Sequence, residues 1–319
     1  MLIELSELTK DYDSFRAVNH ISFQINRGEI VGFLGPNGAG KTTTLKILTC
    51  YMSPTSGTAK VAGFDIYDDS LEVRRRIGYL PESNALYPEM NVLDFLVFSA
   101  QMRHIPKSEI KTRIKQVIAD CGLGDQLLKD IGELSKGLKQ RLGLAQAILH
   151  EPDILILDEP TSGLDPNQIV EIRRLIRELG QEKTVILSTH VLQEVQAVCS
   201  RIIVINKGKI VADNSREELQ SAQGRERVYL QVQAAEDALA VLSKVQGVGR
   251  VSVRDQSAGI TGYEVEAGTE EDIRPALFHC AVQNKWTILE MRREIASLED
   301  VFRRLTVEGT ANENSGESQ

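Results

Sequence analysis

Short apolar runs alternate with stretches of helical period through the first two thirds of the chain. Segments 2–8, 20–26 and 30–35 are predicted to be strands, because their apolar residues alternate or run together over a strand's length. A helix is predicted to open at Thr42, and a buried strand is expected to end in two carboxylates at Asp158 and Glu159. This alternation predicts an α/β fold.

Residues 91–150 interrupt that alternation and are predicted to be mostly helical. Their clearest signal is a stripe at positions i, i+4, i+7, i+8 and i+11, which is typical of an amphipathic helix and is formed by Ile110, Ile114, Val117, Ile118 and Cys121. We therefore expect a helical subdomain at about 83–150, inserted into an α/β domain that spans 1–224.

The composition shifts near Arg225, and the pattern beyond it predicts a second domain at 225–307. Its expected order is βαββαβ, a small ferredoxin-like α+β unit, with Trp286 and His279 in its core. The apolar positions after Ser297 predict a closing helix. The polar segment 308–319 is predicted to be a disordered tail.

Composition limits the classes of protein that fit. The 319 residues suit about two domains. The net charge of −8 argues against a nucleic-acid binder, which usually has a basic face. No apolar run approaches the length of a membrane span, the N-terminus lacks the basic start of a signal peptide, and the four cysteines are too widely spaced for a C-x-x-C motif. These features predict a cytosolic protein with reduced thiols.

One glycine-rich segment between a predicted strand and a predicted helix carries the strongest chemical signal. It fits G-x-x-x-x-G-K-[ST], a loop whose amide groups converge on nucleotide phosphates. The helix N-terminus adds the positive end of its dipole. Lys41 is expected to reach the β- and γ-phosphates and Thr42 to bind Mg²⁺. The full segment is Gly35, Pro36, Asn37, Gly38, Ala39, Gly40, Lys41, Thr42 and Thr43.

Two further strands are predicted to end in polar residues beside this loop. In a phosphate-loop protein, Asp158 is expected to hold Mg²⁺ through water, and Glu159 to orient and polarise the attacking water. His190 ends another buried strand, where ligands of open α/β sheets bind, so we expect it to contact the γ-phosphate.

Two other residues allow two interpretations each. Tyr12 could stack on a nucleobase or pack on the edge of a sheet. Ser135 is a plausible helix N-cap, and the helix start that it opens could also bind an anion.

Taken together, these motifs resemble those of the ATP-binding subunits of ABC transporters. The resemblance rests on Gly35–Thr43, the signature Leu134–Gln140, Asp158-Glu159-Pro160, the D-loop Ser162–Pro166 and His190, in that order. It covers roughly residues 2–220. The surrounding sequence is similar to ATPases paired with ABC-2-type permeases, and is closest to the gliding-motility and nitrous-oxide-accessory branch.

The resemblance implies roles for several of these residues. Tyr12 stacks on adenine, Glu159 is the catalytic carboxylate, and His190 senses the γ-phosphate. Ser135 and Gly137 close on the nucleotide of a second subunit. Two subunits then enclose two ATP molecules, each with Mg²⁺, and Asp165 lies at their interface.

The sequence departs from the family pattern in two of its motifs. Glu82 stands where the family usually has glutamine, and a carboxylate can only accept hydrogen bonds. Glu82 could still approach Mg²⁺ or its waters, but its repulsion with phosphate argues against the usual role. In the signature, Lys136 and Leu138 replace the common glycine and glutamine, and Lys136 adds a cation near a phosphate.

The expected function is therefore ATP hydrolysis that drives a separate ABC-2-type permease, in export, by a homodimer at the cytoplasmic face of the membrane. The alternative is a soluble ABC ATPase that acts on nucleic acid or ribosomes. Ser135 follows Lys41 by only 94 positions, without sustained heptads, so the long coiled coil of the DNA-repair members has no place here. The chain also holds one ATPase unit, whereas ribosome-acting members hold two.

Overall fold

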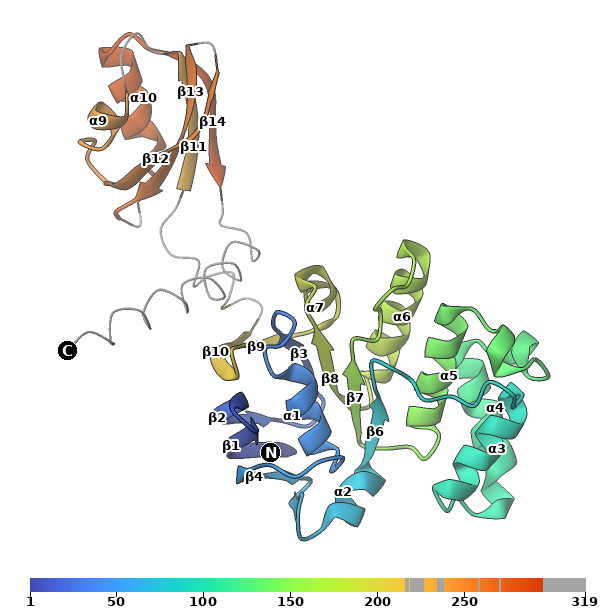
Figure 1. The fold of residues 1–319 in the computed structure, drawn as a ribbon. Coiled ribbons are helices and arrows are strands. Elements are labelled where there is room, and N and C mark those ends of the chain that lie inside the picture. Colours follow the sequence, from blue (N-terminus) through green and yellow to red (C-terminus); the bar gives the residue numbers. More distant parts are fainter. Residues whose placement is uncertain (216–217, 219–226, 234–237, 258, 270, 295–319) are drawn as a thin grey trace. The chain divides into compact units, whose positions relative to one another are not determined.

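A computed structural model describes residues 1–215, 218, 227–233, 238–257, 259–269 and 271–294 (Figure 1). These residues divide into two compact units, one within Met1–Arg216 and the other within Glu217–Arg304. The predicted closing helix and the predicted tail at 308–319 lie outside the described residues. The predicted domain boundaries stay predictions.

A six-stranded sheet forms the centre of the first unit, in the order β10-β9-β3-β8-β7-β6. Five neighbouring strands run parallel, and β10 pairs with β9 in the antiparallel sense. The predicted α/β fold is confirmed. The strands are β3 Ile30–Leu34, β6 Ile77–Leu80, β7 Ile154–Asp158, β8 Thr184–Thr189, β9 Arg201–Asn206 and β10 Lys209–Ser215.

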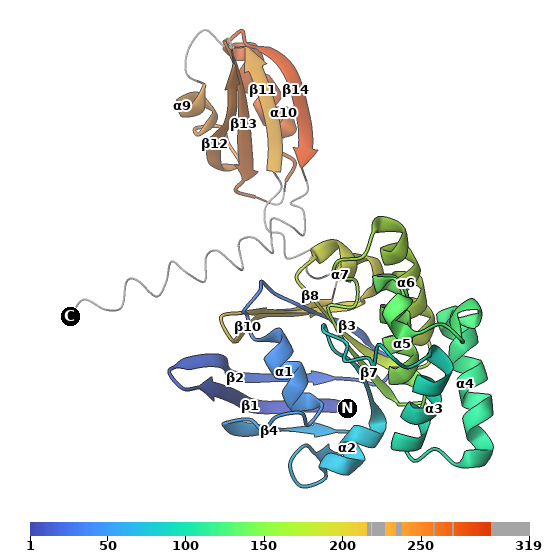
Figure 2. The same cartoon turned by 45° about the vertical axis from the view of Figure 1, so that its right-hand side comes forward.

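A second, antiparallel sheet lies beside the first, in the order β2-β1-β4-β5. Its first two strands form a longer hairpin than the sequence predicted, because the pairing of β1 with β2 continues to Tyr12 and Phe15. The helix α1 lies along this sheet (Figure 2), and one apolar core joins both sheets to α1. The strands are β1 Ile3–Tyr12, β2 Phe15–Ile25, β4 Ser56–Val61 and β5 Phe64–Asp65.

The predicted helical stretch is confirmed. Helices α3, α4 and α5 pack against one another, and α4 buries Ile114, Val117 and Cys121 from the predicted stripe. No helix in the described part of the chain is long and apolar enough to cross a membrane. The helices of this unit are α1 Lys41–Leu48, α2 Ser70–Arg76, α3 Val92–Met102, α4 Lys107–Cys121, α5 Lys136–Ile148, α6 Pro166–Leu179 and α7 Leu192–Val198.

The second unit has the predicted βαββαβ order, and its antiparallel sheet runs β12-β13-β11-β14. One apolar core joins residues of the sheet to residues of both helices, and Trp286 packs partly buried against it. His279, expected in the core, is instead exposed, because α10 turns it away from the sheet while it buries Leu277 and Cys280. The elements are β11 Arg227–Gln233, α9 Leu239–Leu242, β12 Val248–Ser257, β13 Ile260–Ala267, α10 Arg274–Gln283 and β14 Thr287–Glu294.

Candidate active site

The glycine-rich loop joins the end of β3 to the start of α1. Gly40 precedes the helix with a φ of 105°, and a Cβ there would lie 2.4 Å from the carbonyl oxygen of Ala17. Only glycine fits that position. No side chain caps α1. Its first amide groups can therefore serve a bound anion.

Lys41 opens α1 and is buried inside the curve of the loop. Its ammonium group donates hydrogen bonds to the carbonyl oxygens of Gly35, at 2.8 Å, and Pro36, at 3.2 Å. The same Nζ lies 3.5 Å from Oε1 of Glu159. The cation is thus fixed between the loop and the end of β7.

Asp158 ends β7 as a fully buried carboxylate whose two oxygens accept no hydrogen bond of regular geometry. Burial raises the pKa of Asp158, and the nearby hydroxyls of Ser188 and Thr42 oppose that shift. A buried carboxylate without partners is costly unless a cation compensates it. The oxygen atoms of Asp158 and Thr42 are the ligand type that Mg²⁺ prefers, and Mg²⁺ sites usually combine one or two such ligands with substrate phosphates.

Glu159 follows Asp158 with a φ of 48°, and its backbone N–H donates to the carbonyl of Ser188 at 3.0 Å. Its buried carboxylate faces Lys41 on one side. On the other side both of its oxygens lie 3.0 Å from Nδ1 of His190, just beyond β8. The two parallel strands therefore deliver the carboxylate and the imidazole as a pair.

A cavity of about 470 Å³ brings most of the predicted site residues together. It also includes two residues that the sequence analysis missed, Phe15 and Ala17. Phe15 pairs with Tyr12 across the tip of the hairpin and is 59% exposed. An aromatic residue so close to Tyr12 in the sequence was the feature that could have indicated it. The lining residues are Tyr12, Phe15, Ala17, Asn37, Gly38, Gly40, Lys41, Thr42, Thr43, Glu82, Glu159, Ser162 and His190.

Gly35, Pro36, Ala39 and Asp158 lie in the loop or at the end of β7 without lining this cavity. Three other predicted site residues lie outside the lining, where α5 and α6 begin. Ser135 caps α5 by accepting a hydrogen bond from the Leu138 amide. Asp165 caps α6 by accepting from two backbone amides at 3.0 Å. A Cβ on Gly137 would lie 2.7 Å from Cδ of Gln168. The two helix starts are thus in close contact, and a larger residue at Gly137 would require the end of the Gln168 side chain to move.

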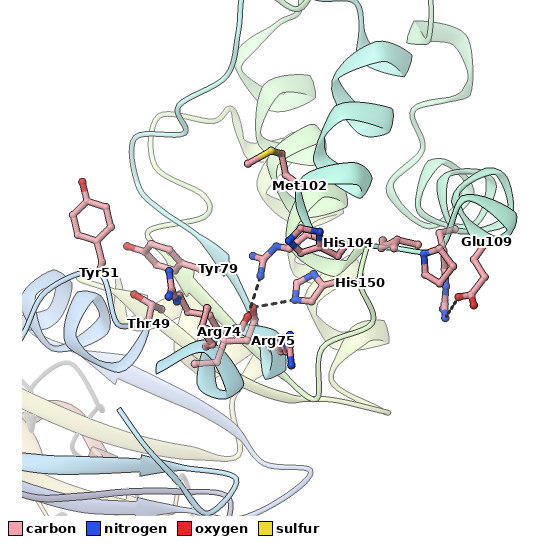
Figure 3. A pocket seen from close by; sticks show the side chains of 15 residues that line it. Thr49, Tyr51, Arg74, Arg75, Tyr79, Met102, His104, Glu109 and His150 are labelled. Atoms are coloured by element: carbon pink, nitrogen blue, oxygen red, sulfur yellow. Dashed lines mark hydrogen bonds and ion pairs between the residues drawn. The ribbon is translucent and has the colours of Figure 1, made fainter. Parts of the chain in front are cut away.

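A second cavity, of about 860 Å³, lies between the end of α1, α2, β6 and the start of α4 (Figure 3). Tyr51, Leu71 and Met102 contribute exposed apolar side chains to it. Its basic residues are Arg74, Arg75, Arg103, His104, Arg113 and His150.

His150 is held neutral at the floor of this second cavity. Its Nε2 pairs with the carbonyl of Ile77 at 3.1 Å. Burial lowers the pKa of His150 to about 4, and the positive charge of Arg103 adds to that shift. Arg103 in turn donates to the carbonyl of Arg74 at 2.9 Å. The positive charge here is therefore carried by arginines.

Comparison with known proteins gives consistent matches. The family described as "ABC transporter" matches residues 18–162. An uncharacterized ABC transporter ATP-binding protein of Bacillus subtilis, YxlF, is 36% identical, over 94% of this chain and 98% of its own. The bacitracin transport ATP-binding protein BcrA of Bacillus licheniformis is 35% identical, over 97% of this chain and 98% of its own. The dimeric post-hydrolysis structure of the ATP-binding cassette MJ0796, bound to ADP and Pi, aligns with a TM-score of 0.62 and 26% identity, over 67% of this chain and 98% of that one.

Proposed function

This chain belongs to the ATP-binding subunits of ABC transporters, and we propose that it binds and hydrolyses ATP to drive a membrane permease that is a separate chain. One observation supports this proposal at the level of individual residues. The carboxylate of Glu159 lies between Lys41 and His190 in the cavity that the glycine-rich loop borders.

ATP binding is assigned to the loop and the hairpin tip. The amide groups at the start of α1 receive the phosphates, and Lys41 exchanges its carbonyl partners for phosphate oxygens. Tyr12 and Phe15, exposed at the cavity mouth, offer ring faces to the adenine. The hydroxyl of Tyr12 contacts Sδ of Met52 at 3.2 Å, which helps to orient the ring.

The residues present fit a Mg²⁺ ion. Thr42 would hold it directly and Asp158 through water, and the bound ion would neutralise phosphate charge. Glu159 then positions and polarises the attacking water from its place beside His190. His190 is expected to contact the γ-phosphate. Glu82 borders the same cavity, where its carboxylate is suited to accept from water.

The remaining site residues are assigned to a second copy of the chain. Ser135, Gly137 and Asp165 lie apart from the cavity in their own subunit, so each nucleotide site needs these groups from a partner. A two-fold homodimer satisfies this need at both sites at once.

We assign the second cavity to the permease (Figure 3). It lies where the helical subdomain meets Tyr79, on the strand that leads to Glu82, so a segment bound there is well placed to sense nucleotide binding. In this proposal the chain works at the cytoplasmic face of a membrane, bound to its permease. The ABC-2 type of the permease, the gliding-motility and nitrous-oxide-accessory branch and the export direction stay predictions from the sequence.

Purification from native membranes tests the partner, and ATP binding tests the site. We expect a polytopic membrane protein to co-purify with the chain. Lys41→Ala should abolish ATP binding in a calorimetric titration, while Lys46→Ala, on the same helix but outside the cavity, should not. Co-purification with ribosomes or nucleic acid instead would favour the alternative function. Retained ATP affinity in Lys41→Ala would contradict the loop assignment.

A further inference from the structure

Glu194 is a buried carboxylate on α7 that the proposed mechanism does not use. It is 4% exposed and does not line the nucleotide cavity. Thr161 donates its hydroxyl to Oε1 of Glu194, and Thr189 donates its hydroxyl to Oε2 at 2.7 Å. Both threonines are themselves buried. The carboxylate is therefore held by two hydroxyl donors, one in the loop after β7 and one at the end of β8.

The two threonines stand next to the residues that matter most for hydrolysis. Thr161 is two positions after Glu159, in the loop that leaves β7. Thr189 is the last residue of β8 and directly precedes His190. Its hydroxyl also accepts from the amide of Val191 at 3.1 Å. Glu194 thus bridges the loop that carries the carboxylate to the loop that carries the imidazole.

This bridge fixes a spacing that the backbone alone fixes only in part. The hydrogen bond from the Glu159 amide to the Ser188 carbonyl joins the loop after β7 to the end of β8 at one point. The Glu194 carboxylate joins them at a second point, through charge-assisted bonds that are stronger than neutral ones. Because the two segments are joined at both points, they cannot easily rotate relative to each other about the backbone hydrogen bond. The 3.0 Å separation of His190 from Glu159 depends on that alignment.

Thr161 also connects the bridge to the loop that we assign to the dimer interface. Its carbonyl accepts from the Leu164 amide at 3.2 Å, one residue before Asp165. A displacement of Asp165 by the partner subunit would therefore reach Thr161 and, through Glu194, the loop of His190.

We infer that Glu194 is a positioning residue for ATP hydrolysis, which aligns Glu159 with His190 and links that pair to the Ser162–Pro166 loop. The inference rests on the proposed function. We expect a change at Glu194 to affect hydrolysis more than ATP binding, because its carboxylate holds the two threonine hydroxyls beside the catalytic pair and does not line the nucleotide cavity. Thr189 meets the phosphate loop only through its backbone carbonyl, which accepts from the Gly35 amide at 3.3 Å. Misalignment of a catalytic group by about 1 Å can cost on the order of 100-fold in rate.

Four variants of the full-length chain test the inference, each with kcat and ATP affinity measured. Glu194→Ala should lower kcat at least about tenfold with ATP affinity within about threefold of wild type. Glu194→Gln can still accept from one hydroxyl and donate to the other, so it should restore most of kcat. Thr161→Val should lower kcat, and Thr161→Ser should restore it. Gln193→Ala, at the exposed neighbouring position on α7, is the matched control.

The outcomes separate a positioning role from a merely structural one. A Glu194→Ala/Thr161→Val double variant that is no slower than Glu194→Ala alone supports a shared bridge. Wild-type kcat in both Glu194→Ala and Thr161→Val would overturn the inference. So would a loss of ATP affinity in step with kcat. If Glu194→Ala fails to fold, the comparison of Thr161→Val with Thr161→Ser tests the inference instead. A wild-type chain that binds ATP without hydrolysing it would overturn the proposed function itself, independently of the variants.

Discussion

Nδ1 of His190 lies 3.0 Å from each carboxylate oxygen of Glu159. The two residues are 31 positions apart, at the ends of the neighbouring parallel strands β7 and β8. Because both partners of Nδ1 are carboxylate oxygens, that nitrogen carries the proton and donates it. The imidazole therefore helps to hold the carboxylate in the position from which it can polarise water.

Glu159→Gln is expected to bind ATP and hydrolyse it at least about 100-fold more slowly. The amide keeps the size of the side chain but loses the charge that polarises water. The ATP-bound variant should therefore accumulate as a dimer in size-exclusion chromatography. Near-normal turnover would contradict the assignment of the catalytic carboxylate, and Glu82→Gln, at the same cavity, is the matched comparison.

Two inactive variants should complement each other if each site is shared between subunits. Lys41→Ala damages the phosphate loop that one subunit contributes to each site. Ser135→Arg damages the start of α5 that the other subunit contributes. Neither homodimer should therefore hydrolyse ATP. A mixed dimer keeps one intact site. An equal mixture should therefore recover about one quarter of wild-type activity, because half of its dimers are mixed and each holds one of two sites. Activity no greater than that of the separate variants would indicate that the site is complete within one subunit.

Asp158→Asn should have opposite effects on stability and on catalysis. Without Mg²⁺ the variant should be more stable to unfolding by about 1 kcal/mol, because it removes a buried carboxylate without partners. With MgATP its hydrolysis should fall at least about 100-fold, and EDTA should abolish hydrolysis by the wild type. Asp153→Asn is the control, since Asp153 pairs with Arg27 and Arg76 at the surface. Its change should slightly destabilise the chain and leave hydrolysis intact.

The neutral His150 predicts a loss of stability in acid. Its pKa lies at about 4 in the folded chain, below its ordinary value of 6.5. Between these values the unfolded chain binds more protons, so stability falls as pH falls through that window. The loss attributable to His150 from pH 7 to pH 5 is about 2 kcal/mol. Urea titrations followed by circular dichroism should show it in the wild type and not in His150→Gln, which can still donate to the Ile77 carbonyl.

Much of the site was predictable because its residues sit at the boundaries of strongly patterned elements. Asp158 and His190 both follow continuous apolar runs, and parallel strands deliver their last residues to one edge of the sheet. The glycines of the loop mark backbone conformations that few other residues adopt. These are local signals, so they can be read from one sequence.

The rest depends on contacts between segments that are distant in sequence. Phe15 reaches the cavity only because the hairpin extends beyond the predicted strands. Glu194 reads as one polar position in a short helix until Thr161 and Thr189 are placed against it. His279 was wrongly expected in the core, because the sequence of α10 does not reveal which of its sides faces the sheet. In each case the position or exposure of the side chain is set by the segment that packs against it.

Trp286 gives the second unit an optical reporter of its own, because it is the single tryptophan of the chain and packs against the core of that unit. Its emission records the surroundings of one unit only. ATP binds, in our assignment, to the other unit. A change in tryptophan fluorescence on adding MgATP would therefore be a direct signal that the second unit responds to the nucleotide, and an unchanged spectrum would show that its core does not.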